Sequence, residues 1–89
     1  QKAKQILYKN LQTLPACHVF LPSVNFILVK INLRHITMRQ LVFTLRQYNI
    51  LVRECGNYPG LTDSFLRFAV KTTSDNEFLY NTLKKIMNQ

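Results

Sequence analysis

Two arginines, Arg53 and Arg67, are the residues of this chain whose positions most strongly suggest chemistry. Each lies near the middle of a short apolar segment, in the sequences ILVREC and SFLRFAVK. The planar guanidinium of arginine binds carboxylates and phosphates through two parallel charge-assisted hydrogen bonds. A buried guanidinium without a partner is costly, so each arginine should have one. The sequence alone leaves that partner open: Glu54, Asp63, water or a bound anion would each serve.

The period-two alternation of a β-strand predicts which way the arginines point. In SFLRFAVK, Phe68 shares a face with the flanking leucine and valine, and we expect helices to cover that face. Arg67 then lies on the opposite face, beside Ala69, whose small side chain leaves space for a ligand. In ILVREC, Arg53 alternates with Val52 in the same way.

Helical periodicity predicts three helices that would hold these strands in place. The first runs from Lys2 to about Thr13. The second has a T-x-x-Q capping box at Thr37 and ends near residues 48–49. The third runs from about Asp75 to Met87, with an S-x-x-E capping box that begins at Ser74.

The intervening segments predict strands at residues 25–31, 50–55 and 64–71, because they are rich in branched and aromatic residues. The segment ACHVFLPS is expected to be extended, with its sheet pairing limited by Pro22. We therefore predict an α+β fold. A small, mostly antiparallel sheet of about three strands would be covered by helices, in the order α-β-α-β-β-α.

The length of 89 residues allows one small domain. We expect a single module over residues 1–89, with a connecting helix at 1–14 and a domain core at 22–88. No segment is apolar enough to predict a membrane span. The chain lacks an initiating Met, which suggests a piece of a longer protein.

The net charge of +8 invites a nucleic-acid interpretation, but the basic residues are scattered along the chain and form no dense run. Cys17 and Cys55 are far apart, which favours two buried thiols in a reducing cytoplasm over a disulfide. The histidines and cysteines lack the spacing of a metal site, so no metal ligand is predicted.

The segment from ILVRECGNYPGL to NTLKKI, together with the upstream LPSVNFILVKI, carries a family resemblance. It resembles the C-terminal small domain of fold-type I, pyridoxal-phosphate-dependent aminotransferases. The resemblance is closest to the branch that contains histidinol-phosphate aminotransferases and threonine-phosphate decarboxylases, and it covers about residues 22–86. The loop CGNYPGL is most similar to that of the decarboxylases. Glu54 and Gly56 depart mildly from the family pattern.

The resemblance implies roles for both arginines. Arg67 matches the family arginine that binds the substrate carboxylate, and Arg53 matches one that helps to bind the substrate phosphate. It implies a lyase or transferase, either threonine-phosphate decarboxylase of cobalamin biosynthesis or histidinol-phosphate aminotransferase. The substrate would be an amino-acid or amine phosphate.

The resemblance also implies what lies elsewhere. The cofactor pyridoxal phosphate would be bound by the large domain of the same enzyme, which would form a cytoplasmic homodimer. No catalytic or cofactor-binding residue is assigned to this chain, so we do not expect activity from it alone. Neither a nucleic acid nor a membrane is an expected partner. A ferredoxin-like module that binds nucleic acid or a regulatory amino acid is the alternative from another class.

Overall fold

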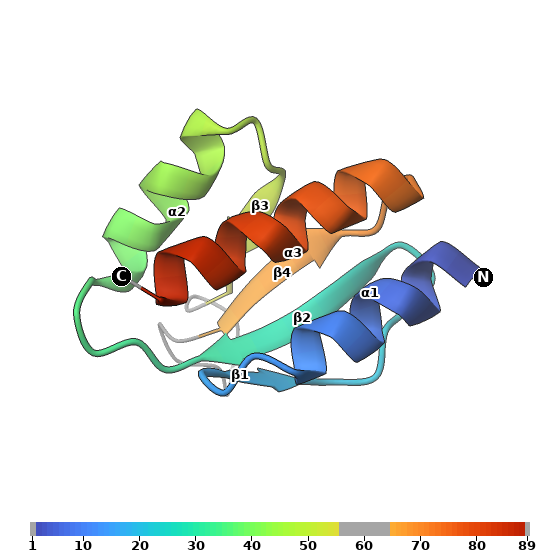
Figure 1. Ribbon diagram of the computed structural model, residues 1–89, viewed down its shortest axis with the longest axis horizontal. Helices are drawn as coiled ribbons and strands as arrows, with labels where there is room; N and C mark the ends of the chain where they lie inside the picture. Colours follow the sequence, from blue (N-terminus) through green and yellow to red (C-terminus); the bar gives the residue numbers. More distant parts are fainter. Residues whose placement is uncertain (1, 56–64, 89) are drawn as a thin grey trace.

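Three helices and four strands make up the residues that the computed structural model describes, which are 2–55 and 65–88 (Figure 1). Their bounds are α1 Lys2–Gln12, β1 Cys17–Val19, β2 Phe26–Ile31, α2 Met38–Gln47, β3 Val52–Glu54, β4 Phe65–Ala69 and α3 Thr73–Met87. All three predicted helices and all three predicted strands are confirmed, with ends that shift by a few residues. The α+β class is therefore correct.

The sheet is antiparallel throughout and has the order β1-β2-β4-β3. The prediction of about three strands is one short, and the element order becomes α-β-β-α-β-β-α. The additional strand is β1, in the segment where Pro22 was expected to limit pairing. That proline follows the last paired residue, Val19, which lies opposite Val29. The hydrogen bonds between β1 and β2 therefore do not require the N–H that Pro22 lacks.

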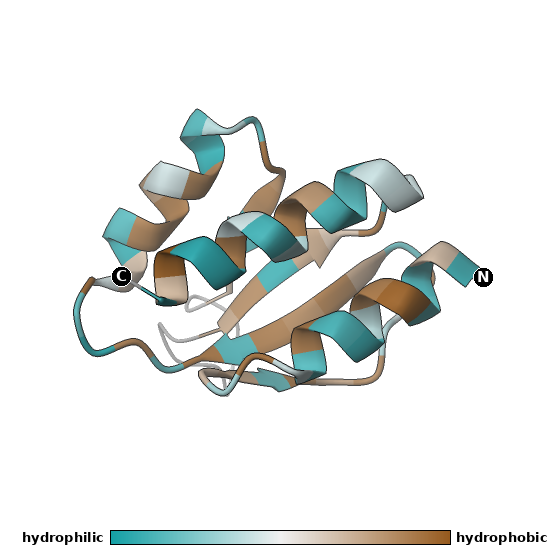
Figure 2. Cartoon of the chain, in the orientation of Figure 1, coloured by the Kyte–Doolittle hydropathy of each residue, from teal (hydrophilic) through white to brown (hydrophobic). Residues whose placement is uncertain are grey.

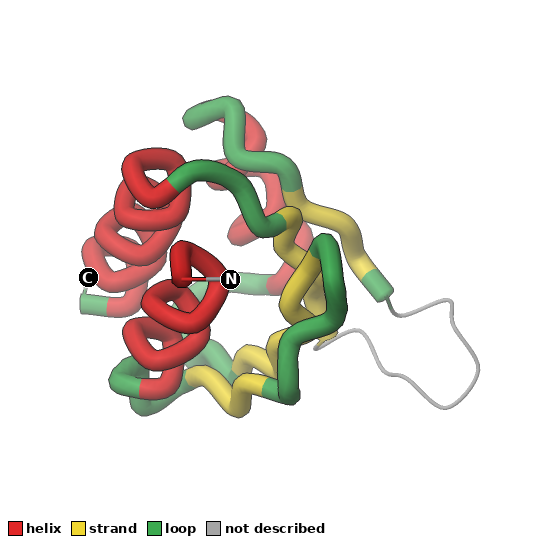
Figure 3. Tube along the Cα trace, turned by 90° about the vertical axis from the view of Figure 1, so that its right-hand side faces the viewer, coloured by secondary structure: helices red, strands yellow, loops and turns green. Residues whose placement is uncertain are grey.

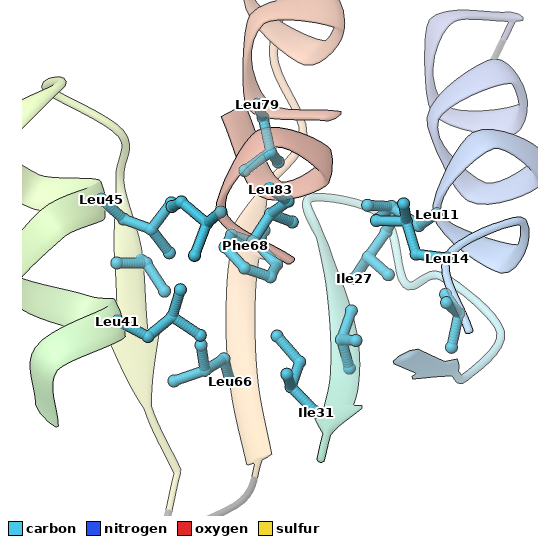
Figure 4. Packing of buried hydrophobic residues seen from close by; sticks show 14 of the residues in the cluster. Leu11, Leu14, Ile27, Ile31, Leu41, Leu45, Leu66, Phe68, Leu79 and Leu83 are labelled. Atoms are coloured by element: carbon cyan, nitrogen blue, oxygen red, sulfur yellow. The ribbon is translucent and has the colours of Figure 1, made fainter. Parts of the chain in front are cut away.

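All three described helices lie on one face of the sheet, so the fold has two layers (Figure 3). The apolar residues of β2 and β4 run through the centre of the molecule (Figure 2). Phe68 of β4 is fully buried between Leu79 and Leu83 of α3 and the leucines of α2 (Figure 4). Leu11 of α1 belongs to the same buried cluster. One continuous core therefore fixes the face of the sheet that the helices cover.

Alternation along β4 follows the prediction. Leu66 and Phe68 are fully buried, whereas Phe65, Arg67 and Ala69 are half-buried on the other face. A shift of one residue would move the whole apolar set out of the core. The buried face of β4 therefore determines where Arg67 points.

Local hydrogen bonds set both ends of α2. The predicted capping box is confirmed: Thr37 Oγ1 accepts from the backbone N–H of Gln40, and the Gln40 side chain accepts from the Thr37 N–H. At the other end the Ile50 N–H donates to the carbonyl of Leu45 over 3.1 Å, which is the pattern of a Schellman motif. Asn49 takes the left-handed position of that motif, with φ 61°. This turn leads the chain directly into β3.

The start of α3 corrects the prediction. Thr72 is the N-cap, in an extended conformation, and its Oγ1 accepts from the Asp75 N–H over 3.2 Å. The predicted box of Ser74 and Glu77 lies inside the first turns instead. The tetrapeptides that begin at Thr72 and at Ser74 both have residue types that can cap a helix. The earlier one forms the cap because the helix begins at Thr73.

The buried side chain of Asn76 joins this region to the rest of the fold. Its Oδ1 accepts from the Lys71 N–H over 3.0 Å, and its Nδ2 donates to the Ala3 carbonyl over 3.4 Å. A buried amide is stable only when it is hydrogen-bonded in this way. Asn76 thus ties the end of β4 to the first turn of α1.

Replacing Thr72 by Ala should lower the free energy of unfolding by about 1 kcal/mol, because the Asp75 N–H loses its acceptor. The matched variant Ser74→Ala should change it by less than about 0.5 kcal/mol, as an ordinary surface substitution does. Urea denaturation followed by circular dichroism measures both. A larger loss for Ser74→Ala would restore the capping box that the sequence predicted.

Candidate anion-binding site

Arg53 and Arg67 lie directly opposite each other on the edge strand β3 and its neighbour β4. The preceding pair, Val52 and Phe68, faces the helices and is buried. The two arginines therefore project from the other face of the sheet, as predicted. Side chains directly opposite in an antiparallel pair have Cβ atoms about 4.5–5.5 Å apart. One small anionic ligand could contact both guanidinium groups.

Two like charges in opposite positions destabilise a sheet unless a counter-charge is present. The chain has only four carboxylates. Glu54 pairs with Leu66 in the register, so it belongs to the face that the helices cover. Asp75 and Glu77 lie on α3, in the helix layer, and the fourth, Asp63, lies outside the described residues. The face that carries the arginines is thus strongly positive among the described residues.

Phe26 of β2 supports the guanidinium of Arg67. The Cζ atom of Arg67 lies 4.4 Å from the centroid of the Phe26 ring, which is a cation–π contact. Phe26 lies opposite Ala69 in the register. The space that the small Ala69 was expected to leave for a ligand is therefore shared with this ring. This contact uses no hydrogen bond of the guanidinium, so the N–H groups of Arg67 remain suited to a planar anion.

A cavity of about 390 Å³ lies against both arginines. This volume falls in the usual range for small-molecule sites, about 300–1,000 Å³. The cavity is lined by Asn25, Phe26, Arg46, Leu51, Val52, Arg53, Arg67 and Ala69. The structure thus brings the two predicted residues together in one small site.

Neither Arg46 nor Phe26 was predicted to belong to this site. Phe26 belongs to the NF pair of the upstream strand, so the motif itself was the available signal. Arg46 lies in the last turn of α2. A basic residue there commonly compensates the helix dipole, so its position alone does not indicate a binding site.

An aromatic cluster lies on the same face, next to the arginines. The rings of Phe20 and Phe65 stack with centroids 5.9 Å apart, and His18 meets Phe20 edge-on at 4.8 Å. Lys30 approaches the Phe65 ring at 5.8 Å. Phe20 and Phe26 remain 36% and 37% exposed. This half-exposed apolar surface is of the kind that a second domain or a partner covers.

Cys55 is buried as expected, whereas Cys17 is only partly buried, and neither thiol is well suited to nucleophilic chemistry. Burial raises the pKa of Cys17 to about 12, so its neutral form predominates at physiological pH. Burial also raises the pKa of Cys55, while the charges of Arg67 and Arg53 lower it. Within residues 2–55 and 65–88, no three His, Cys, Asp or Glu side chains gather as a metal site. In the same ranges no helix is long and apolar enough to cross a membrane.

A larger cavity, of about 670 Å³, lies between α2 and α3 on the helix side of the molecule. Its lining includes the exposed rings of Phe43, Tyr48 and Phe78, with Arg39 and Lys85. Neither predicted arginine reaches it. We therefore place the candidate site at the smaller cavity, where the cations converge.

Comparison with known proteins gives relatives of two kinds. The chain is 31% identical over 80 residues to a threonine-phosphate decarboxylase of Salmonella typhimurium. It is 25% identical over 84 residues to a histidinol-phosphate aminotransferase of Methanosphaera stadtmanae. The structure superposes on a histidinol-phosphate aminotransferase of Clostridium acetobutylicum with a TM-score of 0.84 and 32% identity, over 98% of this chain.

The similarity covers nearly all of this chain but a small part of each relative. The two sequence matches cover 90% and 94% of this chain, and 21% and 23% of the relatives. The match to the solved structure covers 26% of that chain. The chain thus spans about a fifth to a quarter of the proteins that it matches. No protein-family profile matches it.

Iodoacetamide at pH 8 should modify Cys17 about 1,000-fold more slowly in the folded chain than in urea. The rise in pKa from 9.0 to about 12 lowers the thiolate fraction by that factor. Mass spectrometry of a Cys55→Ala variant measures the rate at Cys17 alone. The folded-state rate should still be rising with pH at pH 9.0, where the thiol of the unfolded chain is half ionised. Equal rates in the folded and unfolded chain would show that the fold does not raise the pKa of this thiol.

Proposed function

We propose a function on the premise that this chain belongs to the family of threonine-phosphate decarboxylases and histidinol-phosphate aminotransferases, as a homologue of one segment of those enzymes. The chain forms the C-terminal small domain of a pyridoxal-phosphate-dependent enzyme that acts on a phosphorylated amino acid or amine. Arg67 binds the substrate carboxylate and Arg53 the substrate phosphate. The observation that carries this proposal is the direct opposition of the two arginines across β3 and β4.

The geometry supports a ligand with two anionic ends. A single carboxylate would neutralise one guanidinium and leave the other opposed by a like charge. Threonine phosphate, with a carboxylate and a phosphate, supplies one anion to each arginine, whereas histidinol phosphate has no carboxylate and supplies an anion to one of them. Arg67 is half-buried and held against the Phe26 ring, whereas Arg53 is exposed on the edge strand. A rigid fork suits the planar carboxylate.

Binding of both ends would orient the substrate about its central carbon. A decarboxylase needs the bond to the carboxylate perpendicular to the cofactor ring, and an aminotransferase needs the bond to hydrogen there. Correct positioning of this kind can supply much of the rate enhancement. Pyridoxal phosphate supplies an electron sink for the carbanion. The contribution of this chain is to hold the substrate.

The described lining of the cavity does not fit the cofactor itself. It contains no lysine, the residue type to which pyridoxal phosphate is attached in enzymes. The cofactor and the catalytic groups would therefore come from the large domain. The half-exposed aromatic cluster of His18, Phe20 and Phe65 supports a domain contact on this face. We also propose that the longer enzyme is a homodimer and is cytoplasmic.

Between the two reactions, we favour decarboxylation of threonine phosphate in cobalamin biosynthesis. The identity of 31% to a decarboxylase sequence supports it, as does the loop Cys55–Leu61, whose motif falls largely outside the described residues. Histidinol-phosphate aminotransferase is the second candidate. The 32% identity to a solved enzyme of that name favours it.

An assay of the longer polypeptide that contains this chain, loaded with pyridoxal phosphate, separates the two candidates. We expect carbon dioxide from L-threonine phosphate. Formation of glutamate from 2-oxoglutarate in the presence of histidinol phosphate would instead identify the aminotransferase. If neither product formed, the assignment to phosphorylated substrates would be wrong.

Replacing Arg67 by Lys should lower kcat/KM by about 10- to 100-fold, because an ammonium cannot form the two parallel hydrogen bonds of the guanidinium. Circular dichroism and the melting temperature should be unchanged, since Arg67 lies outside the core. The matched control is Arg39→Lys in the first turn of α2, a residue that lines the other cavity. Unchanged kinetics in the Arg67 variant would remove this residue from the site.

A further inference from the structure

We propose that Arg46 is a third cation of the same site, and that it gives the site a preference for a phosphate monoester in its dianionic form. This inference rests on the proposed roles of Arg53 and Arg67. It adds a specificity-determining residue and a charge state for the ligand. Arg46 comes from a helix, whereas the other two arginines come from the sheet.

The turn after α2 brings Arg46 to the site. The bonds from Asn49 N–H to the Arg46 carbonyl, 3.0 Å, and from Ile50 N–H to the Leu45 carbonyl, 3.1 Å, close the Schellman motif. The chain then enters β3 next to the helix end. Arg46 Nη2 donates to the carbonyl of Val52 over 3.3 Å, one residue before Arg53.

The hydrogen-bond pattern of the sheet explains why that carbonyl is accessible. The Cys55 N–H donates to the Phe65 carbonyl over 3.0 Å, so residues 55 and 65 form a hydrogen-bonded pair. Such pairs alternate along an antiparallel ladder. The pair of Arg53 and Arg67 is then also hydrogen-bonded, and the Val52 carbonyl points to the free edge of β3. Arg46 caps this edge from outside.

Capping the edge leaves most of the binding capacity of Arg46 for a ligand. A guanidinium has five N–H donors, and the bond to Val52 uses one of them. Arg46 lines the cavity together with Arg53 and Arg67. These three are the charged residues in its described lining, so three positive charges face one space of about 390 Å³.

Charge balance points to a dianionic phosphate. A carboxylate carries one negative charge, and a phosphate monoester carries about 1.5 to 2 negative charges at pH 7. Two arginines would leave the second phosphate charge uncompensated. The third guanidinium would balance it. A sulfate ester of the same shape carries a single charge and should gain little from Arg46.

A purely structural role for Arg46 makes a different prediction. A cation in the last turn of a helix stabilises it through the helix dipole, and a cap on an edge carbonyl stabilises the sheet. Either role would change the melting temperature without distinguishing one ligand from another. The test therefore compares two ligands that differ only in charge.

The experiment is a titration of the 89-residue chain, labelled with nitrogen-15, followed through the arginine Nε–H signals in NMR spectra. The probes are O-phospho-L-threonine and L-threonine O-sulfate. Arg46→Gln should weaken phosphothreonine binding about 10-fold, the loss of one charge-assisted hydrogen bond, and sulfate-ester binding less than about 2-fold. Arg46→Lys, which keeps the charge if the Gln variant fails to fold, should have an intermediate effect.

The control variant is Arg39→Gln, which removes the same charge from the same helix but lines the other cavity. It should change both affinities by less than about 2-fold, because exposed charges at a distance are screened by salt. If Arg46→Gln matched this control while Arg53→Gln and Arg67→Gln weakened binding, the third-cation role would be wrong and the proposed site would stand. If the unsubstituted chain bound phosphothreonine no more tightly than threonine, the proposed site would fail as well.

Discussion

The antiparallel register between β3 and β4 is the constraint on which the rest of the structure depends. It pairs Val52 with Phe68 on one face and Arg53 with Arg67 on the other. The core can form only when Phe68 points to the helices, because its ring fills the space between α2 and α3. The same register then places two guanidinium groups side by side. Hydrophobic burial on one face thus positions the polar chemistry of the other face.

The exposed face of the sheet carries features that weaken an isolated domain. Opposed like charges and half-exposed aromatic rings both raise the free energy of the folded chain. The described acidic residues, Glu54, Asp75 and Glu77, are placed toward the helix layer and do not relieve the charge. Functional sites commonly retain such unfavourable local features, which a ligand or a neighbouring domain then relieves.

Local signals accounted for most of the secondary structure. The capping box of Thr37 and Gln40 was predictable because its two bonds join residues three apart. The start of α3 was misplaced because two overlapping tetrapeptides, beginning at Thr72 and Ser74, carry equivalent capping residues. The strand β1 was missed because its three residues pair with Val29 and its neighbours. Such pairing is a tertiary contact that Pro22, read locally, argued against.

The sequence by itself determined the class of fold and the faces of β4, and it singled out Arg53 and Arg67 as candidates for binding an anion, because periodicity and side-chain chemistry are local properties. The tertiary structure alone decided that these arginines lie opposite each other, that the Cζ atom of Arg67 lies 4.4 Å from the centroid of the Phe26 ring and that Arg46 joins their cavity. These three relations join residues from separate elements. Their distances depend on strand order, on register and on the turn after α2, which are set when the core packs as a whole.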